Sequence, residues 1–283
     1  MVKVVVDSGS TKSDWLVFEN QTYLYSFETL GMNPEVLSTE ELEKRLDAAV
    51  MQLQKYNTLE IYFYGSGCGT PRSRRLVYNA INTAFTHHTI NKIDVREDTY
   101  AAVYATCTNN EKGIVCINGT GSNCSYYDGN EVHQAVDSLG FMAMDDFSGV
   151  SFGRQIIRSY YFKTLPTELA NILDKEYNMS SDFIKAHFYK KENPNAYMAS
   201  FLPFLITHKN HPFFSEMIRK EIQFFIDHYI FQFEASQTVP INFIGSTAYL
   251  LKNEIRLELE KNGLTSGHFF QKPKDGLILF FTQ

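Results

Sequence analysis

Two segments far apart in the chain carry residue types that could bind a phosphate. The first, Val2–Ser13, is an apolar run that ends in Asp7 and continues as Ser-Gly-Ser-Thr-Lys-Ser. The second, Gly113–Asn123, is a similar run that continues as Asn-Gly-Thr-Gly-Ser-Asn. Glycine has no Cβ to hold a ligand away, so turns of this kind expose backbone N–H groups and hydroxyls to an anion. Each turn alone is also typical of an ordinary surface hairpin, but the pair predicts two loops that bind one polyphosphate.

Two aspartates are candidates for the chemistry itself. Asp7 ends a buried apolar run, where a carboxylate needs a partner such as a cation. Asp98 stands where a helix is expected to begin, just before the apolar stretch Thr99–Cys107. That position alone is typical of a helix cap, and only its order along the chain relative to the other motifs favours a chemical role.

A further glycine-containing turn, Gly65–Thr70, follows the apolar segment Ile61–Tyr64. It suggests a dinucleotide-binding loop, but the third glycine of that motif is missing and the unit is not the first strand–helix pair. The lysine-containing motif of P-loop nucleotide-binding proteins is absent from the chain. We interpret Gly65–Thr70 as a loop on the substrate side of the site.

The spacing of apolar residues predicts alternating strands and helices. For the first part of the chain it predicts strands at Val2–Val6, Asp14–Phe18 and Tyr23–Phe27, a helix at Thr39–Tyr56, a strand at Ile61–Tyr64, a helix at Pro71–Phe85, a strand near Ile93–Val95 and a helix from Asp98 to Cys107. The strand–turn–strand pattern then restarts at Gly113, with a tight turn at Asp128-Gly129. Beyond Ser151 it predicts helices at Asn195–Thr207 and Phe213–Glu234, a strand at Ile241–Ile244, a helix at Thr247–Lys261 and a last strand at Leu277–Phe281.

The restart after Asn109–Lys112 predicts two related α/β domains, residues 1–110 and residues 111–283. Ligands of such sheets bind beyond the carboxyl ends of the strands, where both glycine-containing turns would lie. The length of 283 residues and the 44% hydrophobic content are sufficient for two buried cores. The net charge of −6, without a basic block, argues against a nucleic-acid partner.

In their order along the chain, these segments resemble the motifs of the actin-like ATPase superfamily of sugar kinases, and within it the N-acetylglucosamine kinase and BadF-type ATPase group. The two turns resemble the first and second phosphate motifs of this family, and Phe243–Tyr249 (FIGSTAY) is similar to its adenosine motif. The resemblance implies an α/β fold of two ribonuclease H-like domains, each a mixed sheet flanked by helices, with an inter-domain nucleotide cleft.

The resemblance also implies a reaction. It is the ATP-dependent phosphorylation of an amino sugar, with N-acetylglucosamine and its 6-phosphate as the first expectation and with ATP and Mg²⁺ as cofactors. Asp98 matches the catalytic aspartate, which accepts the proton of the attacking hydroxyl. Asp7 would hold Mg²⁺ through water, because this ion gives up its waters reluctantly. The other implied nucleotide-binding residues are Gly9, Ser10, Thr11, Lys12, Gly119, Thr120, Gly121, Gly245, Ser246 and Tyr249.

The sugar-binding residues implied by the resemblance are Asn33, Gly67, Asn123, Ser138, Asp145 and Gly149. Asn33 precedes Pro34 and could instead start a turn. One segment departs from the family, whose Gly-Asp-Glu-Gly-Ser around the sugar-binding acid is replaced by Met144-Asp145-Asp146-Phe147-Ser148. Glycine allows a ligand to approach the backbone closely, and it can adopt a φ that other residues rarely adopt. The departure therefore leaves open an altered pocket or the loss of sugar phosphorylation.

Two alternatives to an N-acetylglucosamine kinase stay open: an ATPase that switches a partner protein, and a kinase of glucosamine, N-acetylmuramic acid or glucose. Four single cysteines argue against the zinc and iron–sulfur sites of some relatives. The aromatic stripes near Phe201 and Phe225 are core residues or a homodimer contact. The chain begins directly with a strand and has no run of membrane-spanning length, so we expect a cytoplasmic protein without a membrane partner.

Overall fold

The computed structural model describes residues 1–9, 12–108 and 111–282. The chain forms two compact units, one of Met1–Asn110 with Lys272–Gln283 and one of Glu111–Gln271. We call them unit 1 and unit 2. The predicted second domain contained the whole chain after residue 110, whereas in the structure the C-terminal segment packs with unit 1.

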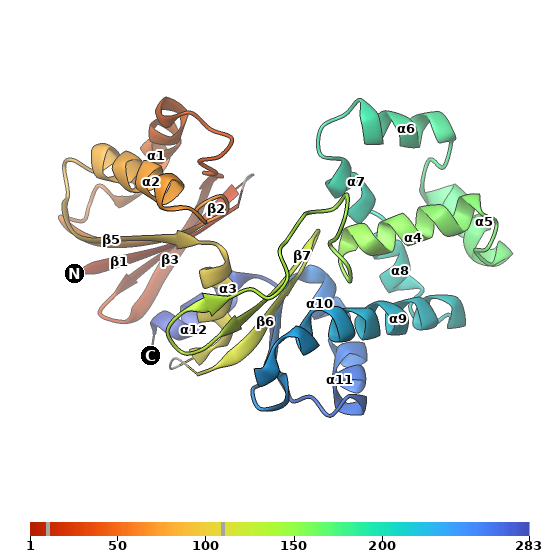
Figure 1. Cartoon of the computed structure of the whole chain (residues 1–283). Coiled ribbons are helices and arrows are strands. Elements are labelled where there is room, and N and C mark those ends of the chain that lie inside the picture. The colour runs from red at the N-terminus through yellow and green to blue at the C-terminus, as the bar shows by residue number, and fades with distance from the viewer. Residues whose placement is uncertain (10–11, 109–110, 283) are drawn as a thin grey trace. The chain divides into compact units, whose positions relative to one another are not determined.

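Unit 1 contains a mixed sheet of five strands in the order β3-β2-β1-β4-β5 (Figure 1). The strands are β1 (Val2–Ser8), β2 (Lys12–Glu19), β3 (Thr22–Leu30), β4 (Thr58–Gly65) and β5 (Thr89–Glu97). Strand β2 is antiparallel to β1 and to β3, whereas β1, β4 and β5 are parallel. Parallel strands end at the same edge of a sheet, so the residues that follow β1, β4 and β5 meet there.

The helices of unit 1 are α1 (Thr39–Leu53), α2 (Pro71–Ala84), α3 (Thr99–Thr106) and α12 (Pro273–Phe281). One core joins the β-branched residues of β1 to α1 and α2, as with Val4, Leu46 and Ile81, none of which is exposed. On α12, Phe281 packs against the Phe18 and Tyr62 rings. The predicted last strand at Leu277–Phe281 is therefore wrong, and this apolar run is a helix buried against the sheet and α3.

Unit 2 repeats the topology of unit 1. Its sheet order, β10-β9-β6-β7-β8, is that of unit 1 read from the other edge, with β6 in the place of β1. The antiparallel pairs are β6–β7 and β7–β8, and the parallel pairs are β6–β9 and β9–β10. The strands are β6 (Gly113–Asn118), β7 (Ser122–Tyr127), β8 (Val132–His133), β9 (Ile241–Ile244) and β10 (Ser266–Phe270). The predicted restart at Gly113 is thus a second copy of the same sheet.

The helices of unit 2 are α4 (Gly149–Tyr161), α5 (Thr167–Glu176), α6 (Ser181–Tyr189), α7 (Pro194–Ala199), α8 (Leu202–Thr207), α9 (Pro212–His228), α10 (Ser246–Leu250) and α11 (Lys252–Lys261). Two short 3-10 helices, Ile230–Gln232 and Glu234–Gln237, follow α9. Two predicted long helices are each divided. Pro203 stands in the first turn of α8 and cannot continue α7, and Leu251, with φ −108° and ψ 18°, separates α10 from α11.

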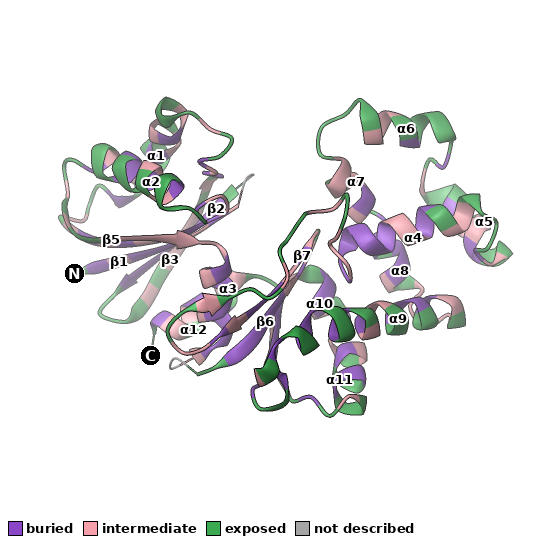
Figure 2. Cartoon of the chain, viewed as in Figure 1, coloured by how far each residue is buried: buried purple, intermediate pink, exposed green. Residues whose placement is uncertain are grey.

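Burial follows this arrangement. Figure 2 shows β1 and β6, the central strand of each sheet, as mostly buried, with exposed residues on the outer sides of α1 and α2. The core of unit 2 joins β6 and β9 to helices α4, α8, α9 and α11 and includes the unexposed residues Ile114, Phe201, Phe214 and Ile255. Each unit therefore has its own core, and each has polar turns at the carboxyl ends of its parallel strands.

Candidate active site

The carboxyl ends of β1, β4 and β5 bring three of the predicted site segments together in unit 1. The N–H of Ser66 donates to the carbonyl oxygen of Ser8 at 2.9 Å, and the N–H of Asp98 donates to the carbonyl oxygen of Gly65 at 3.2 Å. Asp7 precedes Ser8 on β1, so the two bonds connect the Asp7 strand, the Gly65–Thr70 loop and Asp98 at one edge.

Both aspartates at this edge have perturbed acidities. Burial, followed by the charges of Asp98 and Asp14, raises the pKa of Asp7 to about 7, although the charge of Lys12 opposes the shift. Burial and then the charge of Glu97 raise the pKa of Asp98 to about 6, against hydrogen bonds from nearby backbone N–H groups. A carboxylate with a pKa near 6 is ionised at neutral pH and is a better proton acceptor than an ordinary aspartate.

Asp98 was also open to interpretation as a helix cap. It occupies the position before α3, but its φ and ψ are helical (−60° and −23°) and its side chain makes no capping hydrogen bond. A helix cap normally has extended φ and ψ and accepts a bond from the first turn. Capping therefore does not explain an aspartate at this position, and its proximity to Asp7 favours a role in chemistry.

The carboxylates around Asp7 fit a hydrated magnesium ion. The described residues contain no group of three or more side chains that could hold a metal directly. Mg²⁺ usually binds one or two carboxylates, several waters and substrate phosphates. The negative charges of Asp14 and Asp98 beside Asp7 raise the pKa of Asp7, and a bound cation would offset them.

The first phosphate turn joins β1 to β2. The N–H of Gly9 donates to the carbonyl oxygen of Lys12 at 2.9 Å, so this amide is not directed at a ligand. Lys12 Nζ lies 3.0 Å from Asp14 Oδ2 and 2.7 Å from Glu28 Oε1. The predicted ligands Ser10 and Thr11 lie outside the described residues.

Asn33 and Gly67, both expected on the sugar side, are neighbours. Asn33 Nδ2 donates to Ser66 Oγ at 3.1 Å, and Asn33 Oδ1 accepts the N–H of Glu35 at 2.9 Å. Gly67 has a φ of +81°, and a Cβ at this residue would lie 2.1 Å from Asn33 Oδ1. Asn33 thus starts a turn, as the alternative interpretation stated, and it also contacts the Gly65–Thr70 loop.

The second phosphate turn joins β6 to β7 and is held through its carbonyl groups. The carbonyl oxygen of Gly119 accepts the N–H of Gly149 and the hydroxyl of Thr247, both at 2.8 Å, and that of Thr120 accepts the N–H of Val150 at 3.0 Å. The N–H of Gly119 bonds to the carbonyl oxygen of Gly121 at 2.9 Å. The candidate donors to a phosphate here are therefore the amides of Thr120 and Gly121.

Asp145 contacts this same turn. Its Oδ1 accepts the N–H of Ser122 at 3.1 Å, and a Cβ at Gly121 would lie 2.6 Å from its Oδ2. A Cβ at Gly149, the predicted neighbour of the sugar, would lie 2.9 Å from the Cβ of Ala199. In the described residues, hydrogen bonds join Asp145 to Ser122 but not to Asn123 or Ser138. Asn123 Oδ1 instead accepts from Gln134 Nε2 at 3.1 Å, and Ser138 is exposed between β8 and α4.

The Gly245 turn, expected to contact adenosine, packs against the same strand end. Gly245 has a φ of +116°, and a Cβ there would lie 2.4 Å from the carbonyl oxygen of Asn118. Ser246 follows as an exposed residue at the start of α10. The ring of Tyr249 is half-buried, with Lys252 Nζ 4.7 Å from its centre. The end of β9 thus lies beside the end of β6, as that of β4 lies beside β1.

Two residues of Met144–Ser148, the segment that departs from the family, have the backbone conformation that glycine favours. Asp145 and Phe147 have φ values of 66° and 51°, in the left-handed region that favours glycine. The Phe147 ring is 1% exposed and lies 5.9 Å from the rings of both Phe152 and Phe225, measured between centres. It points into the core, so it does not fill a sugar pocket, and Met144 also packs against this core.

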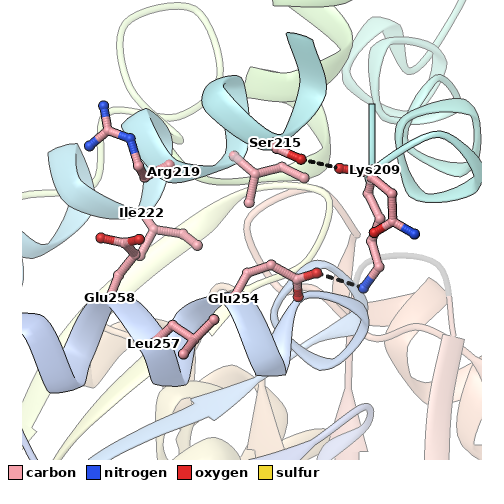
Figure 3. A pocket seen from close by; sticks show the side chains of 9 residues that line it. Lys209, Ser215, Arg219, Ile222, Glu254, Leu257 and Glu258 are labelled. Carbon is pink, nitrogen blue, oxygen red and sulfur yellow. Dashed lines mark hydrogen bonds and ion pairs between the residues drawn. The ribbon is translucent and has the colours of Figure 1, made fainter. Parts of the chain in front are cut away.

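A cavity of unit 2 contains none of the predicted site residues. It lies between α9 and α11, with a volume of about 190 Å³, and Ile222 and Leu257 contribute apolar side chains to its wall (Figure 3). Lys209 Nζ lies 2.8 Å from Glu254 Oε1. The candidate catalytic and binding residues therefore lie at the sheet edges and not in this cavity.

Glu221, on α9, is a candidate site residue that the sequence pattern did not predict. Its Oε2 accepts the N–H of Phe147 at 2.9 Å and also the hydroxyl of Ser151. In the sequence, only the apolar face of this helix had a recognisable pattern, so nothing there indicated Glu221 as a site residue.

Within the described residues, no helix has both the length and the apolar character needed to cross a membrane.

The comparison with solved structures finds a similar protein of nearly equal length. A candidate N-acetylglucosamine kinase from Porphyromonas gingivalis is 31% identical, with a TM-score of 0.88, 99% of this chain covered and 98% of that one. No protein-family model matches the chain, and no curated protein sequence does.

Two more distant structures share the fold. A candidate N-acetylglucosamine kinase from Chromobacterium violaceum is 14% identical, with a TM-score of 0.71, 100% of this chain covered and 99% of that one. A ROK family glucokinase from Streptomyces griseus, in complex with glucose and AMPPNP, is 13% identical, with a TM-score of 0.57 and coverages of 98% and 97%. At these identities the likeness concerns the fold of two mixed sheets flanked by helices.

Proposed function

The chain belongs to the N-acetylglucosamine kinase group of the actin-like ATPase superfamily, a group of ATP-dependent sugar kinases, and we propose that its acceptor is an amino sugar, with N-acetylglucosamine as the first candidate. The product in this proposal is the sugar 6-phosphate, ATP is the donor, and Mg²⁺ neutralises charge on the phosphates. One observation carries the proposal more than any other. Asp7, the Gly65–Thr70 loop and Asp98 converge at the edge of one sheet, joined by the Ser66–Ser8 and Asp98–Gly65 hydrogen bonds.

Phosphoryl transfer requires mainly positioning and charge neutralisation, with little covalent work for the protein. We assign the role of general base to Asp98. Its carboxylate accepts the hydroxyl proton of the sugar as the oxygen attacks the γ-phosphate, a contribution of roughly 10²- to 10⁴-fold in rate. Burial and the charge of Glu97 raise the pKa of Asp98 to about 6, which is still below 7, so this carboxylate is mostly ionised at neutral pH.

Nucleotide binding is assigned to both phosphate turns and to the Gly245 turn. The amides of Thr120 and Gly121 are the donors to phosphate oxygens in unit 2. The bonds from Gly149 and Thr247 to the carbonyl of Gly119 fix the turn before a ligand arrives. In unit 1, Asp7 holds the magnesium ion through water, and Ser10 and Thr11 remain the predicted phosphate ligands.

Sugar recognition is assigned to Asn33 and Gly67 in unit 1 and to Asp145 and Gly149 in unit 2. Short amide and carboxylate groups make directional hydrogen bonds to hydroxyls. The buried Phe147 ring supports retention of the sugar site, since the side chain that replaces a family glycine is directed into the core. Asn123 and Ser138 stay predicted contributors.

A thermal-shift experiment tests the proposal. The unfolding temperature is measured with MgATP or a non-hydrolysable analogue, alone and with N-acetylglucosamine, glucosamine, N-acetylmuramic acid or glucose. A ligand that binds the folded state stabilises it by mass action, so we expect a further shift with one sugar only. Stabilisation by nucleotide alone, with no sugar adding to it, would contradict a kinase and favour the ATPase switch.

A further inference from the structure

Glu221 lies outside every predicted motif and yet holds the turn that carries Asp145. It belongs to α9, and its Oε2 accepts the peptide N–H of Phe147 at 2.9 Å and the hydroxyl of Ser151, in the first turn of α4. One carboxylate oxygen of α9 thus connects the 145–148 turn to the helix that follows it.

The carbonyl group of Phe147 is held by the end of β6, just before the Gly119–Gly121 turn. Asn118, the last residue of β6, donates from Nδ2 to the carbonyl oxygen of Phe147 at 3.1 Å. Phe147 is therefore bound through its N–H by α9 and through its carbonyl by β6. Its ring, packed between Phe152 and Phe225, fixes it from a third side.

Such restraint is needed because the turn is unfavourable by itself. Asp145 and Phe147 both have positive φ, which residues with a Cβ adopt rarely unless the surroundings impose it. The hydroxyl of Ser148 donates to the carbonyl oxygen of Asp145 at 2.5 Å and stabilises the turn from within. Without Glu221, the Phe147 N–H would lose its partner in a half-buried environment.

The restraint determines where the Asp145 carboxylate lies. Asp145 Oδ1 accepts the N–H of Ser122, and its Oδ2 lies so close to Gly121 that a Cβ there would be 2.6 Å away. We propose that Glu221 is a positioning residue for the acceptor sugar: it fixes the left-handed 145–148 turn and thereby holds the Asp145 carboxylate beside the Gly119–Gly121 turn. This inference rests on the proposed function, in which Asp145 binds the sugar.

The kinetic test compares three variants of the full chain. Glu221→Ala removes the acceptor oxygen, Glu221→Gln keeps one, and Glu216→Ala removes a glutamate of the same helix that pairs with Arg219 at 2.8 Å. Loss of a hydrogen bond to a charged group predicts a rise of about tenfold or more in the KM for the acceptor sugar with Glu221→Ala, with a smaller change in the KM for ATP. We expect Glu221→Gln and Glu216→Ala to stay near wild type. Equal acceptor KM values in Glu221→Ala and Glu216→Ala would overturn the inference.

Amide hydrogen exchange gives a second readout that does not depend on activity. The N–H of Ser122 bonds to Asp145 and makes no bond to Glu221. If Glu221 positions Asp145, the Ser122 amide exchanges faster in Glu221→Ala, and at the wild-type rate in Glu221→Gln and Glu216→Ala. Faster exchange confined to Phe147 and Ser151 would overturn the positioning role. If the wild type phosphorylates no sugar, the proposed function fails, and the exchange at Ser122 still decides whether Glu221 positions Asp145.

Discussion

The peptide N–H of Asp98 donates a hydrogen bond of 3.2 Å to the carbonyl oxygen of Gly65. Gly65 is the last residue of β4 and pairs with Glu97, the last residue of β5. The register of these two parallel strands therefore sets the position of the candidate base relative to the loop that contains Gly67. In this way two residues far apart in the sequence become parts of one site.

Replacement of the candidate base tests its role. Asp98→Asn keeps the size of the side chain but removes the proton acceptor, so we expect a loss of roughly 10²- to 10⁴-fold in kcat with unchanged ATP affinity. Steady-state kinetics and nucleotide titration check both parts. Asp94→Asn is the matched control, because Asp94 lies on β5, the strand that ends just before Asp98, and pairs with Arg96. A variant Asp98→Asn with the wild-type kcat would remove the catalytic role.

The acidity of Asp98 predicts a pH dependence. Only the ionised carboxylate accepts a proton, and its pKa is raised to about 6, so kcat/KM should rise as the pH increases through this value. The charge of Glu97 contributes to the rise of the pKa, and Glu97→Gln should therefore move the acid limb of the profile to lower pH. The pH profiles of the two proteins provide the measurement. An identical acid limb in both would show that Glu97 does not tune the base.

We expect the ionised carboxylate of Asp7 to destabilise the folded chain. The pKa of Asp7 in the folded chain is raised from 3.8 to about 7, so the folded state binds the proton more tightly than the unfolded state does. The contribution of this group to stability is present at low pH and is lost as the pH rises between these two values. Asp7→Asn should therefore be more stable than wild type at pH 8 without Mg²⁺, with a smaller difference at pH 5. Urea unfolding at both pH values measures this, and a less stable variant at pH 8 would contradict it.

We expect two glycines of unit 2 to have different roles, Gly245 in folding stability and Gly119 in ATP binding. Gly245→Ala places a Cβ 2.4 Å from the carbonyl oxygen of Asn118 at a φ of +116°, and strained residues of this kind cost about 1–3 kcal/mol. Gly119→Ala meets no atom within 4 Å, so we expect normal stability but weaker ATP binding, because the added methyl lies on the phosphate turn. Unfolding curves and nucleotide titration check the pair. Unchanged ATP affinity in Gly119→Ala would argue against phosphate contact at this turn.

Gly67 tests the sugar side of unit 1. Gly67→Ala brings a Cβ within 2.1 Å of Asn33 Oδ1 at a residue with a φ of +81°. We expect Asn33 to be displaced, the acceptor KM to rise and the ATP affinity to stay as in wild type. Kinetics with each substrate varied in turn provide the measurement. A change in ATP affinity alone would show that Asn33 and Gly67 do not serve the sugar.

Much of the fold could be predicted because the central strands carry strong local signals. Val2–Val6 and Ile114–Ile117 are β-branched or apolar runs that end in glycine-containing turns, and β1 and β6 are found there. The restart at Gly113 corresponds to the repeated sheet topology. The repeated topology implies a fifth strand after β9 in unit 2. Its residues, Ser266–Phe270, include Gly267 and His268 at a sheet edge and gave no strand pattern.

The remainder depended on tertiary context. The run Leu277–Phe281 is apolar without a distinguishing period, and such a run can be a buried strand or a buried helix. It forms a helix because it packs on α3, where Gly276 allows close approach to the backbone of Ala105. Phe147 was ambiguous for a similar reason. Its sequence position left open an altered pocket or the loss of sugar phosphorylation, whereas in the structure Phe147 has a positive φ and its ring is buried in the core.

Sugar-dependent ADP release is the most direct test of the account. ADP formation is followed with wild type and Asp98→Asn in the presence of MgATP, with and without each of N-acetylglucosamine, glucosamine, N-acetylmuramic acid and glucose. The account predicts ADP release that requires one of these sugars, with N-acetylglucosamine first, and that is lost in Asp98→Asn. ADP release at the same rate without any sugar, or at an undiminished rate in Asp98→Asn, would contradict it.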